Sequence, residues 1–351
     1  MAGGIGSRFW PMSRTDFPKQ FLDILGSGKT LIQQTFDRYS KVVPKENIYI
    51  ITAQEYVSIV KKQLPELADE NILAEPSRKN TAPCIAYIAF KLLKKDPKAL
   101  MIAAPADNLI LETDEFVKTA KKALGFVDHI NALVTIGVKP TYPNTGYGYI
   151  QHDTAEAAPA VYKVKTFTEK PNVELAKAFI ASGDFLWNAG IFTWKVKNVV
   201  AAFEKHLPEI YELFAAERNR FNTPEEKEAI EAIYPQCTNI SIDFAVMEKA
   251  DNVYVIPATF GWSDLGTWNS AWENKEKDYF GNAVVGKNVM VVDANNCMVH
   301  VPDNKLVLLQ GLKDYIVVDT KDVLLICKKD KEQEIKDYVA EVKRNKGDKF
   351  L

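Results

Sequence analysis

Short apolar runs alternate with amphipathic segments between residues 47 and 138 of this 351-residue chain. The apolar runs are typical of strands buried on both faces, and they cover 47–52, 99–104 and 132–138. The other segments repeat apolar residues at helical spacing, and they cover 55–64, 81–94 and 113–127. This alternation predicts an α/β fold with a Rossmann-like mixed, mainly parallel sheet flanked by helices. In such sheets, ligands bind beyond the carboxyl ends of the strands.

The rest of the chain changes character twice. Strand-like segments at 147–151, 160–168, 185–194 and 253–257 are interleaved with helical ones at 173–181, 196–216, 224–234 and 242–250. From residue 281, β runs recur roughly every 8 to 10 residues, which predicts a small β-solenoid or sandwich. An amphipathic helix over 331–344 closes the chain. We therefore expect a large domain over 1–275 and a small β-rich domain over 276–351.

The composition excludes several classes of function. A net charge of −2 gives no broad basic surface for nucleic acid or an anionic membrane, so any polyanion site must be local. The four cysteines and four histidines are widely spaced, which argues against a disulfide framework or a zinc site. No apolar run approaches the roughly 20 residues of a spanning helix, and no signal-peptide pattern occurs. We expect a cytoplasmic location.

The start of the chain combines glycines with basic residues. Gly3, Gly4 and Gly6 let the backbone approach a ligand closely, and successive amides in such a loop form an anion-binding concavity. The basic residues that follow are Arg8, Arg14 and Lys19. This loop predicts a site for a phosphate-rich ligand, and a disordered terminus is the alternative.

A glycine loop of this kind ordinarily follows a strand, and here only Met1 and Ala2 precede it. We expect that the first strand of the sheet is missing and that Met1 corresponds to an internal methionine.

A second glycine-containing stretch, Gly26–Thr30, resembles the end of a P-loop. Asp23 occupies the position of that motif's first glycine, and no apolar strand directly precedes it. Thr30 is therefore predicted to cap a helix over 31–39.

Two acids are candidates for a metal site. Asp107 follows a buried strand, and Asp264 lies in a turn after the strand at 253–257. Each could simply be a turn or capping residue. Together they suit Mg²⁺, which is bound by one or two carboxylates plus substrate phosphates.

Four further polar stretches could contact a ligand or serve only the fold. The stretch 75–83 could read a base edge and hold phosphate at a helix start, or merely cap that helix. Glycines and tyrosines at 145–150 suit a sugar pocket or a hairpin turn. Glu169 and Lys170 could bind a ligand or form a surface ion pair. Asn188 lies among apolar neighbours, where it needs a sugar hydroxyl or a backbone partner.

Taken together, these stretches resemble the mannose-1-phosphate guanylyltransferases, a branch of the sugar nucleotidyltransferase family. Gly3–Arg14 and Pro18–Gln20 resemble the signature loop, in which the Trp-Pro-x-Ser-Arg portion is specific to this branch. The remaining matches lie at 75–83, 105–107, 146–150, 169–171, 187–192, 241–249 and 261–266. The resemblance is dense over residues 1–275 and looser beyond. Asn108 departs from the pattern, because the family usually has a histidine there.

The resemblance implies that GTP and mannose 1-phosphate react in one displacement to give GDP-mannose and pyrophosphate. It implies that Arg8 and Lys19 bind the triphosphate and stabilise developing charge, while Asp107 and Asp264 hold Mg²⁺. The implied nucleotide-binding residues are Gly3, Gly4, Gly6, Ser7, Arg8, Lys19, Glu75, Asn80, Thr81, Pro105 and Asp107. The implied sugar-phosphate-binding residues are Gly146, Tyr147, Glu169, Lys170, Asn188 and Asp264.

The β-rich part is small for independent stability, so we expect it to pack on the large domain or on a second subunit. A homodimer is expected. No partner nucleic acid or membrane is expected, and we expect a single activity without the isomerase domain of the longer family members. One alternative function is a sugar nucleotidyltransferase with a different base or sugar. Another is a non-catalytic sensor that binds sugar nucleotides.

Overall fold

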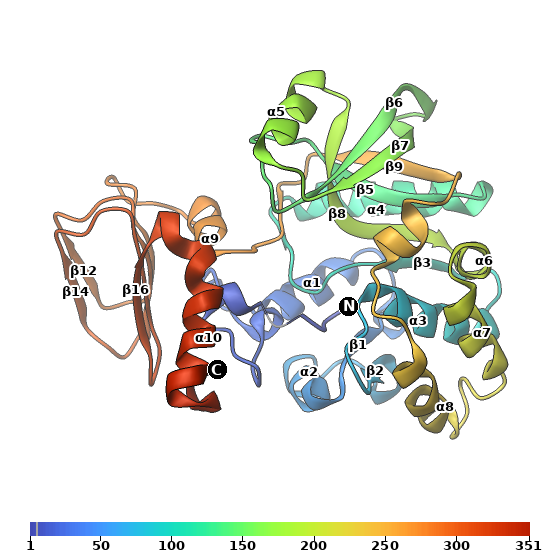
Figure 1. Ribbon diagram of the computed structural model, residues 1–351, viewed down its shortest axis with the longest axis horizontal. Helices are drawn as coiled ribbons and strands as arrows, with labels where there is room; N and C mark the ends of the chain where they lie inside the picture. Colours follow the sequence, from blue (N-terminus) through green and yellow to red (C-terminus); the bar gives the residue numbers. More distant parts are fainter. Residues whose placement is uncertain (5) are drawn as a thin grey trace.

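The computed structural model describes residues 1–4 and 6–351. Figure 1 shows a large unit that contains two sheets and a smaller β-rich unit beside it, with α9 (Trp268–Asn274) near the junction. No helix among the described residues is long and apolar enough to cross a membrane.

The main sheet has six strands in the order β3-β8-β5-β9-β7-β6. Their bounds are β3 Leu100–Ala103, β5 Leu133–Val138, β6 Gly148–Ala158, β7 Val161–Glu169, β8 Phe185–Lys195 and β9 Val253–Ala258. The sheet is mixed, as predicted, but the expectation of mainly parallel pairing is wrong. Among the strands described in this sheet, only β5 and β9 pair in parallel, because β8 runs antiparallel to β3, β5 and β6, and β7 runs antiparallel to β6 and β9. Apolar runs report burial, and they carry no information about strand direction.

Helices cover both faces of this sheet, which confirms the predicted layers. On one face, α3 (Thr81–Lys95) packs with α6 (Val196–His206) and α7 (Pro208–Ala216) in one apolar core. On the other, α4 (Thr113–His129) packs against β5, β8 and β9. The remaining helices are α1 Leu31–Tyr39, α2 Val57–Gln63, α5 Val173–Ser182 and α8 Glu226–Ile233.

Two helical predictions need correction. The segment expected as one helix over 196–216 breaks at Leu207, because Pro208 begins α7 and cannot continue the amide ladder of α6. The segment expected as an α-helix over 242–250 is instead a short π-helical turn at Asp243–Met247. By contrast, the prediction that Thr30 caps α1 is confirmed, and its amide donates to Gln33 Oε1 at 3.0 Å.

A second sheet pairs β1 (Ile50–Ala53) with β2 (Ile72–Glu75) in parallel. The first two residues connect this sheet with the main one. The Ala2 amide donates to Ile51 O at 2.8 Å, and the Met1 amino group donates to Ala104 O at 2.9 Å. An apolar cavity of about 430 Å³ lies beside Met1, between β1 and β3. The expectation of a missing first strand concerns residues before Met1 and stays a prediction.

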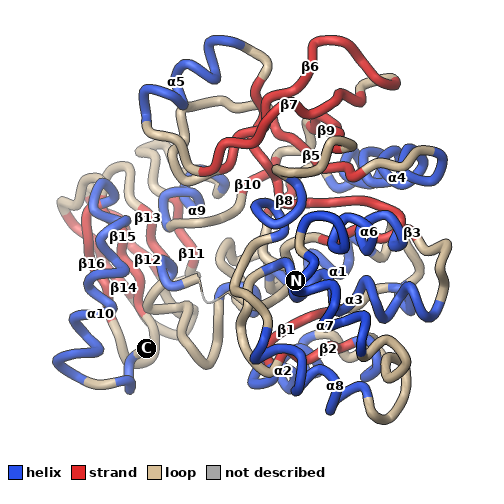
Figure 2. Tube along the Cα trace, turned by 45° about the vertical axis from the view of Figure 1, so that its right-hand side comes forward, coloured by secondary structure: helices blue, strands red, loops and turns tan. Residues whose placement is uncertain are grey.

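The β-rich unit forms a solenoid, which confirms the predicted architecture (Figure 2). Its strands are β11 Ala283–Val285, β12 Val289–Val292, β13 Met298–His300, β14 Val307–Gln310, β15 Tyr315–Asp319 and β16 Leu324–Lys328. Strands β11, β13 and β15 stack in parallel in one sheet, and β12 and β14 do so in the other. From β11 to β15, successive short runs therefore alternate between two sheets, and β16 then pairs antiparallel with β15. The closing helix is α10, Ile335–Lys346.

Candidate active site

The glycine loop folds back on itself at Gly6. Gly6 has a φ of 66°, and a Cβ at this position would lie 2.5 Å from Lys19 Cβ. Only glycine satisfies both constraints, so the loop and Lys19 are held in direct contact. Ser7 and Arg8 follow in a short 3-10 turn, Ser7–Phe9, and both are partly exposed. The backbone thus presents the polar side of the loop while burying Phe9.

Lys19 joins the two predicted metal-site acids. Its side chain is only 6% exposed, and Nζ lies 3.0 Å from Asp107 Oδ2. The same ammonium donates to the backbone oxygen of Asp264 at 2.6 Å. The structure therefore brings together three residues that lie far apart in the sequence, as predicted.

A pair of short strands explains why the two acids meet. Strand β10 (Trp262–Ser263) pairs antiparallel with β4 (Leu109–Ile110), in the register that sets Ser263 opposite Leu109. Asp264 directly follows β10 and Asp107 comes just before β4, so both acids lie at the same end of this ladder. Asn108 is buried, and its Oδ1 accepts from Trp262 Nε1 at 3.2 Å. Asn108, which stands where the family usually has histidine, thus helps to fasten the two segments.

The turn that carries Asp264 is tight and faces Arg8. Gly266 donates its amide to Asp264 Oδ1 at 2.9 Å, and a Cβ on Gly266 would lie 2.6 Å from Oδ2. Arg8 approaches the turn and donates to Gly266 O at 3.4 Å. Arg8 and Lys19 therefore both reach this turn, one at the Gly266 carbonyl and the other at the Asp264 carbonyl.

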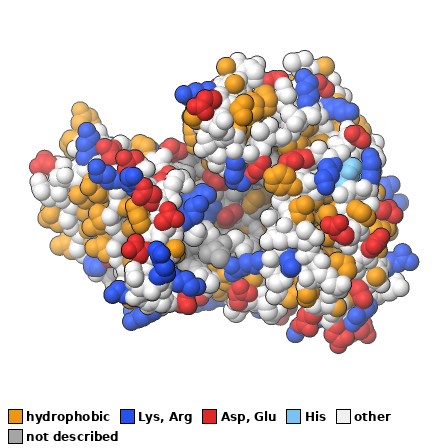
Figure 3. All heavy atoms as spheres, viewed as in Figure 1, with side chains coloured by type: hydrophobic (Ala, Val, Ile, Leu, Met, Phe, Trp, Pro, Cys, Tyr) orange, Lys and Arg blue, Asp and Glu red, His pale blue; other side chains and the backbone are white. Residues whose placement is uncertain are grey.

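A cavity of about 320 Å³ collects most of the predicted nucleotide-binding residues. Those that line it are Gly3, Gly4, Glu75, Asn80, Thr81, Pro105 and Asp107. Gly6, Ser7, Arg8 and Lys19 do not line it, although Gly6 and Lys19 touch each other nearby. Gln20 also lines the cavity and was missed, and its Nε2 donates to Ala2 O at 2.9 Å. Figure 3 shows a hollow near the middle of one face of the molecule, with basic and acidic side chains at its rim.

Glu75 is a buried carboxylate in this cavity. Glu75 is the last residue of β2, and its Oε1 accepts a hydrogen bond from Tyr234 Oη at 2.9 Å. Its Oε2 faces the glycine loop, 3.8 Å from where a Cβ of Gly3 would lie. Burial raises the pKa of Glu75 to about 7, while the hydrogen bond from Tyr234 works in the opposite direction. Glu75 can therefore change its charge near neutral pH.

Asn80 and Thr81 make contacts that serve the start of α3. Asn80 adopts a φ of 66°, and its Oδ1 accepts from the Thr81 amide at 2.9 Å. Thr81 Oγ1 accepts from the Ile242 amide at 2.9 Å. The capping alternative is thus observed for Asn80. Both residues still line the cavity, so a ligand can also reach them.

The predicted sugar-phosphate residues form a second group, which reaches Asp264 through Tyr147. Tyr147 Oη donates to Asp264 Oδ1 at 2.8 Å, and burial raises the pKa of this phenol. Gly146 is exposed and donates its amide to Asn144 Oδ1 at 2.7 Å. Lys170 and Glu169 form an exposed ion pair, and Lys170 has a φ of 45°.

Asn188 lies deeper in the same group. Its Oδ1 accepts from Thr135 Oγ1 at 3.2 Å, and its Nδ2 donates to Asp243 Oδ1 at 2.7 Å. A Cβ at Gly148 would lie 3.6 Å from Asn188 Cβ and 2.6 Å from Glu169 Oε2. Glycine at 148 therefore lets the Glu169 carboxylate lie directly over the strand.

Two acidic or phenolic residues were missed as site residues. Asp243 is the partner of Asn188, and burial raises the pKa of its carboxyl. Tyr234 is fully buried and holds Glu75. Asp243 lies within the matched stretch 241–249, which was the signal for it. Nothing in the sequence marked Tyr234, because its contact joins residues 159 positions apart.

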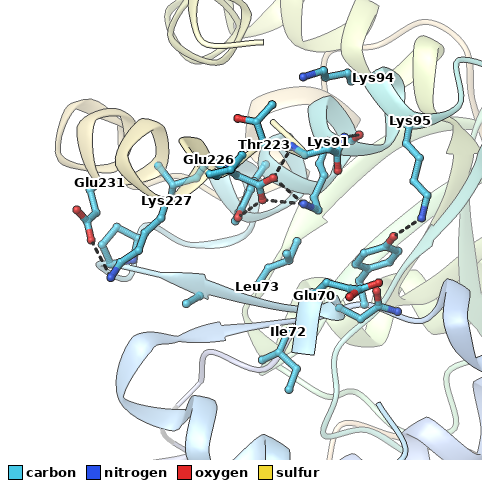
Figure 4. Close-up of a pocket in the computed structure, with 18 of the residues that line it drawn as sticks. Glu70, Ile72, Leu73, Lys91, Lys94, Lys95, Thr223, Glu226, Lys227 and Glu231 are labelled. Atoms are coloured by element: carbon cyan, nitrogen blue, oxygen red, sulfur yellow. Dashed lines mark hydrogen bonds and ion pairs between the residues drawn. The ribbon is translucent and has the colours of Figure 1, made fainter. Parts of the chain in front are cut away.

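A larger cavity lies elsewhere and shares no lining residue with the cavity of about 320 Å³. It is a groove of about 1100 Å³ between β2, α3 and α8 (Figure 4). Its main charged pair is Lys91 with Glu226, at 2.6 Å, and Lys94 donates to two backbone carbonyls. Its size alone does not make it the site, because none of the predicted residues line it.

Residues 1–4 and 6–351 contain no group of three or more His, Cys, Asp or Glu side chains suited to a metal ion. A cation at Asp107 and Asp264 would therefore need further ligands from a bound substrate.

Comparison with known families matches both units. The sequence profile of a family described as nucleotidyl transferase matches residues 1–279. The chain belongs to the nucleotidyl transferase family. A second profile, described as a MannoseP isomerase/GMP-like beta-helix domain, matches residues 287–342 of this nucleotidyl transferase. The family resemblance drawn from the motifs is thereby confirmed.

Curated relatives match this chain over nearly its whole length. A mannose-1-phosphate guanylyltransferase of Salmonella montevideo is 38% identical over 351 residues, which cover 98% of this chain and 73% of the relative. An alginate biosynthesis protein AlgA of Pseudomonas syringae pv. tomato is 38% identical over 348 residues, which cover 97% of this chain and 70% of the relative. The crystal structure of a mannose-1-phosphate geranyltransferase from Thermus thermophilus superposes with a TM-score of 0.88 at 29% identity, covering 98% of both chains.

Proposed function

We propose that this chain transfers GMP from GTP to mannose 1-phosphate, giving GDP-mannose and pyrophosphate. The observation that carries the proposal is the network in which Lys19 contacts both Asp107 and the Asp264 backbone beside the glycine loop. Such a network suits the transfer of a nucleotidyl group. The negative charge of the phosphates must be neutralised there, and the attacking and leaving oxygens must be held in line. The names of the curated relatives support the choice of base and sugar.

In the proposed reaction, a phosphate oxygen of mannose 1-phosphate attacks the α-phosphorus of GTP. A new oxygen–phosphorus bond forms as the bond to the β-phosphate oxygen breaks, and pyrophosphate leaves with that electron pair. Arg8 and Lys19 bind the triphosphate and stabilise the charge that builds on it. No side chain has to form a covalent intermediate, so catalysis rests on positioning and electrostatics.

We propose that Asp107 and Asp264 hold a Mg²⁺ ion when substrates are bound. The donor set fits, since two carboxylates with substrate phosphates are the ligands this hard cation takes. The ion would supply Lewis-acid polarisation of the phosphate oxygens. Tyr147 keeps one Asp264 oxygen oriented through its 2.8 Å hydrogen bond, so the carboxylate is fixed before substrate arrives.

We assign guanine to the cavity beside Glu75. We assign the sugar phosphate to the second group of residues, which contains Lys170 and Asn188. Asp243 and Thr135 hold the Asn188 amide from two directions, which orients it for a sugar hydroxyl. Glu169 lies over Gly148 at the same place. Lys170 would meet the phosphate of the sugar.

Magnesium-dependent release of pyrophosphate from GTP and mannose 1-phosphate tests the proposed function. Release with this pair is expected, and a chain of confirmed fold that releases none would overturn it. Thermal shift separates the bases, because at equal concentration the ligand that binds the folded state more tightly stabilises it more. GTP is expected to raise the melting temperature more than dTTP or UTP, and equal shifts would exclude a guanine site.

We also propose a homodimer that forms through the solenoid. The outward side of β12 and β14 exposes Met290, Leu306 and Leu308, at 52%, 69% and 58%. Adjacent exposed apolar residues of this kind often mark an interface. Sedimentation velocity should show a dimer, and Leu308→Glu should shift it to monomer.

A further inference from the structure

The glycine loop is anchored on both units of the molecule. On the large unit, Gly6 packs on Lys19, and Tyr56 Oη donates to Thr15 O at 2.6 Å. The other anchors come from the solenoid and the closing helix, which lies beside the start of the chain in Figure 1. These second anchors involve Trp10 and Arg14.

Arg14 binds the turn between β15 and β16. Its two terminal nitrogens contact the two oxygens of Asp322 at 2.8 and 2.5 Å, and one also donates to Thr320 Oγ1 at 3.4 Å. The remaining Nε donates to Pro11 O at 3.1 Å. A two-pronged contact of this kind fixes geometry as well as charge. The Arg14 fork is thus directed at the solenoid.

Trp10 binds the end of the chain. Its Nε1, the one donor of the indole, donates to Phe350 O at 2.8 Å, and its own carbonyl accepts from Trp268 Nε1 at 3.2 Å. The neighbouring Phe9 ring packs edge-on against Trp268 at 4.9 Å. Phe9, Trp10 and Trp268 share one apolar core with solenoid residues, among them Met298 and Ile316.

Arg8 lies between these anchors. It directly precedes Phe9, and the Gly6 turn that packs on Lys19 lies just before it. We propose that Trp10 and Arg14 are positioning residues, which hold Arg8 for the triphosphate by fastening the loop to the carboxy-terminal unit. This inference rests on the proposed function, because it takes Arg8 to be a triphosphate ligand. The carboxy-terminal unit then shapes the nucleotide site without contacting the nucleotide.

Asp322→Asn and Arg14→Lys test this role, with Asp303→Asn as the matched control. Asp303 pairs with Lys287 at 2.7 Å in the same solenoid and does not touch the loop. A misplaced ligand group can cost up to about 10²-fold, so we expect KM for GTP to rise on the order of tenfold in the test variants. KM for mannose 1-phosphate and the melting temperature of the test variants should equal those of the Asp303→Asn control.

A charge exchange separates positioning from direct phosphate binding. Arg14→Asp combined with Asp322→Arg should restore KM for GTP if the ion pair matters, and should not restore it if Arg14 itself binds phosphate. If Arg14 itself binds phosphate, Asp322→Asn alone would lower KM for GTP, because it would free the guanidinium. The proposal is overturned by failure of the charge exchange to restore KM, by a lower KM in Asp322→Asn, or by an equal effect of Asp303→Asn.

Hydrogen exchange provides a readout that needs no substrate. The amides of Phe9, Trp10, Met12 and Ser13 donate to backbone oxygens within the loop. Asp322→Asn should speed their exchange, while Asp303→Asn should not. Unchanged exchange would overturn the anchoring itself, whereas faster exchange without GTP turnover by the unmodified chain would overturn only the proposed function.

Discussion

Lys19 and Lys170 are the cations that we assign to the two substrates, and their surroundings differ. The Lys19 side chain is 6% exposed and is held by Asp107 and by the carbonyl of Asp264. The Lys170 side chain is 60% exposed and pairs with the adjacent Glu169. Lys19 is therefore fixed before substrate binds, by contacts from two distant parts of the chain. Lys170 keeps most of its rotamer freedom, which the sugar phosphate must remove on binding.

This contrast indicates a division of labour. Fixed charges contribute most where charge develops in the transition state, since they need no reorganisation at that moment. A mobile cation serves better to capture a small substrate and release a larger product. The nucleotide side should thus govern kcat, and the sugar side should govern KM for mannose 1-phosphate.

The largest expected effect is that of Asp264→Asn. This change removes one of the two carboxylates proposed for Mg²⁺ while keeping the shape of the turn and an acceptor for Tyr147. We expect no measurable magnesium-dependent pyrophosphate release and a normal circular dichroism spectrum. Asp303→Asn serves as the control. Full activity of the Asp264 variant would remove this residue from the metal site.

Replacing Lys19 by Gln should be the next largest effect. Loss of one preorganised group that stabilises charge typically costs about 2.7–4 kcal/mol, or about 10²–10³-fold in kcat. Steady-state release of pyrophosphate measures it. Lys29→Gln is a matched control, since Lys29 forms an exposed ion pair with Asp37 away from the site. A Lys19 variant that changes only KM would contradict the division between the two cations.

Lys170→Gln should have a smaller and different effect. An exposed ion pair contributes at most about 1 kcal/mol, so stability should hardly change. We expect KM for mannose 1-phosphate to rise about tenfold, with kcat and KM for GTP close to those of the unmodified protein. A fall in kcat as large as that for Lys19→Gln would show that both sides act in the transition state.

The smallest expected effect is on stability, through Glu75. Its folded-state pKa is about 7, above the ordinary value of 4.5, so the native state retains a proton that the unfolded state loses between these values. The contribution of Glu75 to the free energy of unfolding should therefore fall as pH rises from about 4.5 to 7, and it should stay at the lower level above pH 7. Glu75→Gln keeps an acceptor for Tyr234 and lacks the titration.

The difference in melting temperature, Glu75→Gln minus unmodified protein, should accordingly be a few degrees more positive at pH 8 than at pH 5. Differential scanning calorimetry at both values measures this. A constant difference would show that Glu75 is ionised in the folded protein over the whole range.

The solenoid and the large unit also differ in how well their sequence predicted them. The short runs and turns of the small unit narrowed its architecture to a solenoid or a sandwich, because each rung depends on its neighbours in the sequence, and the structure shows the solenoid. In the large unit, the runs at 99–104 and 132–138 correctly marked β3 and β5. Their direction was mispredicted, since it depends on β8, whose paired residues lie 49 or more positions further along the chain, as for Val138 and Trp187.

Local sequence was enough to indicate the residue types of the site: glycines where the backbone turns on itself, basic residues beside them, and two acids after apolar runs. These features depend on local chemistry, so each can be proposed from its own motif. Which of these residues meet depends on the tertiary fold. The β4–β10 pairing sets Asp264 beside Asp107, and Tyr234 reaches Glu75 from another element. Arg14 contacts Asp322 across 308 positions. Such contacts are fixed by the packing of whole elements, which no local pattern encodes.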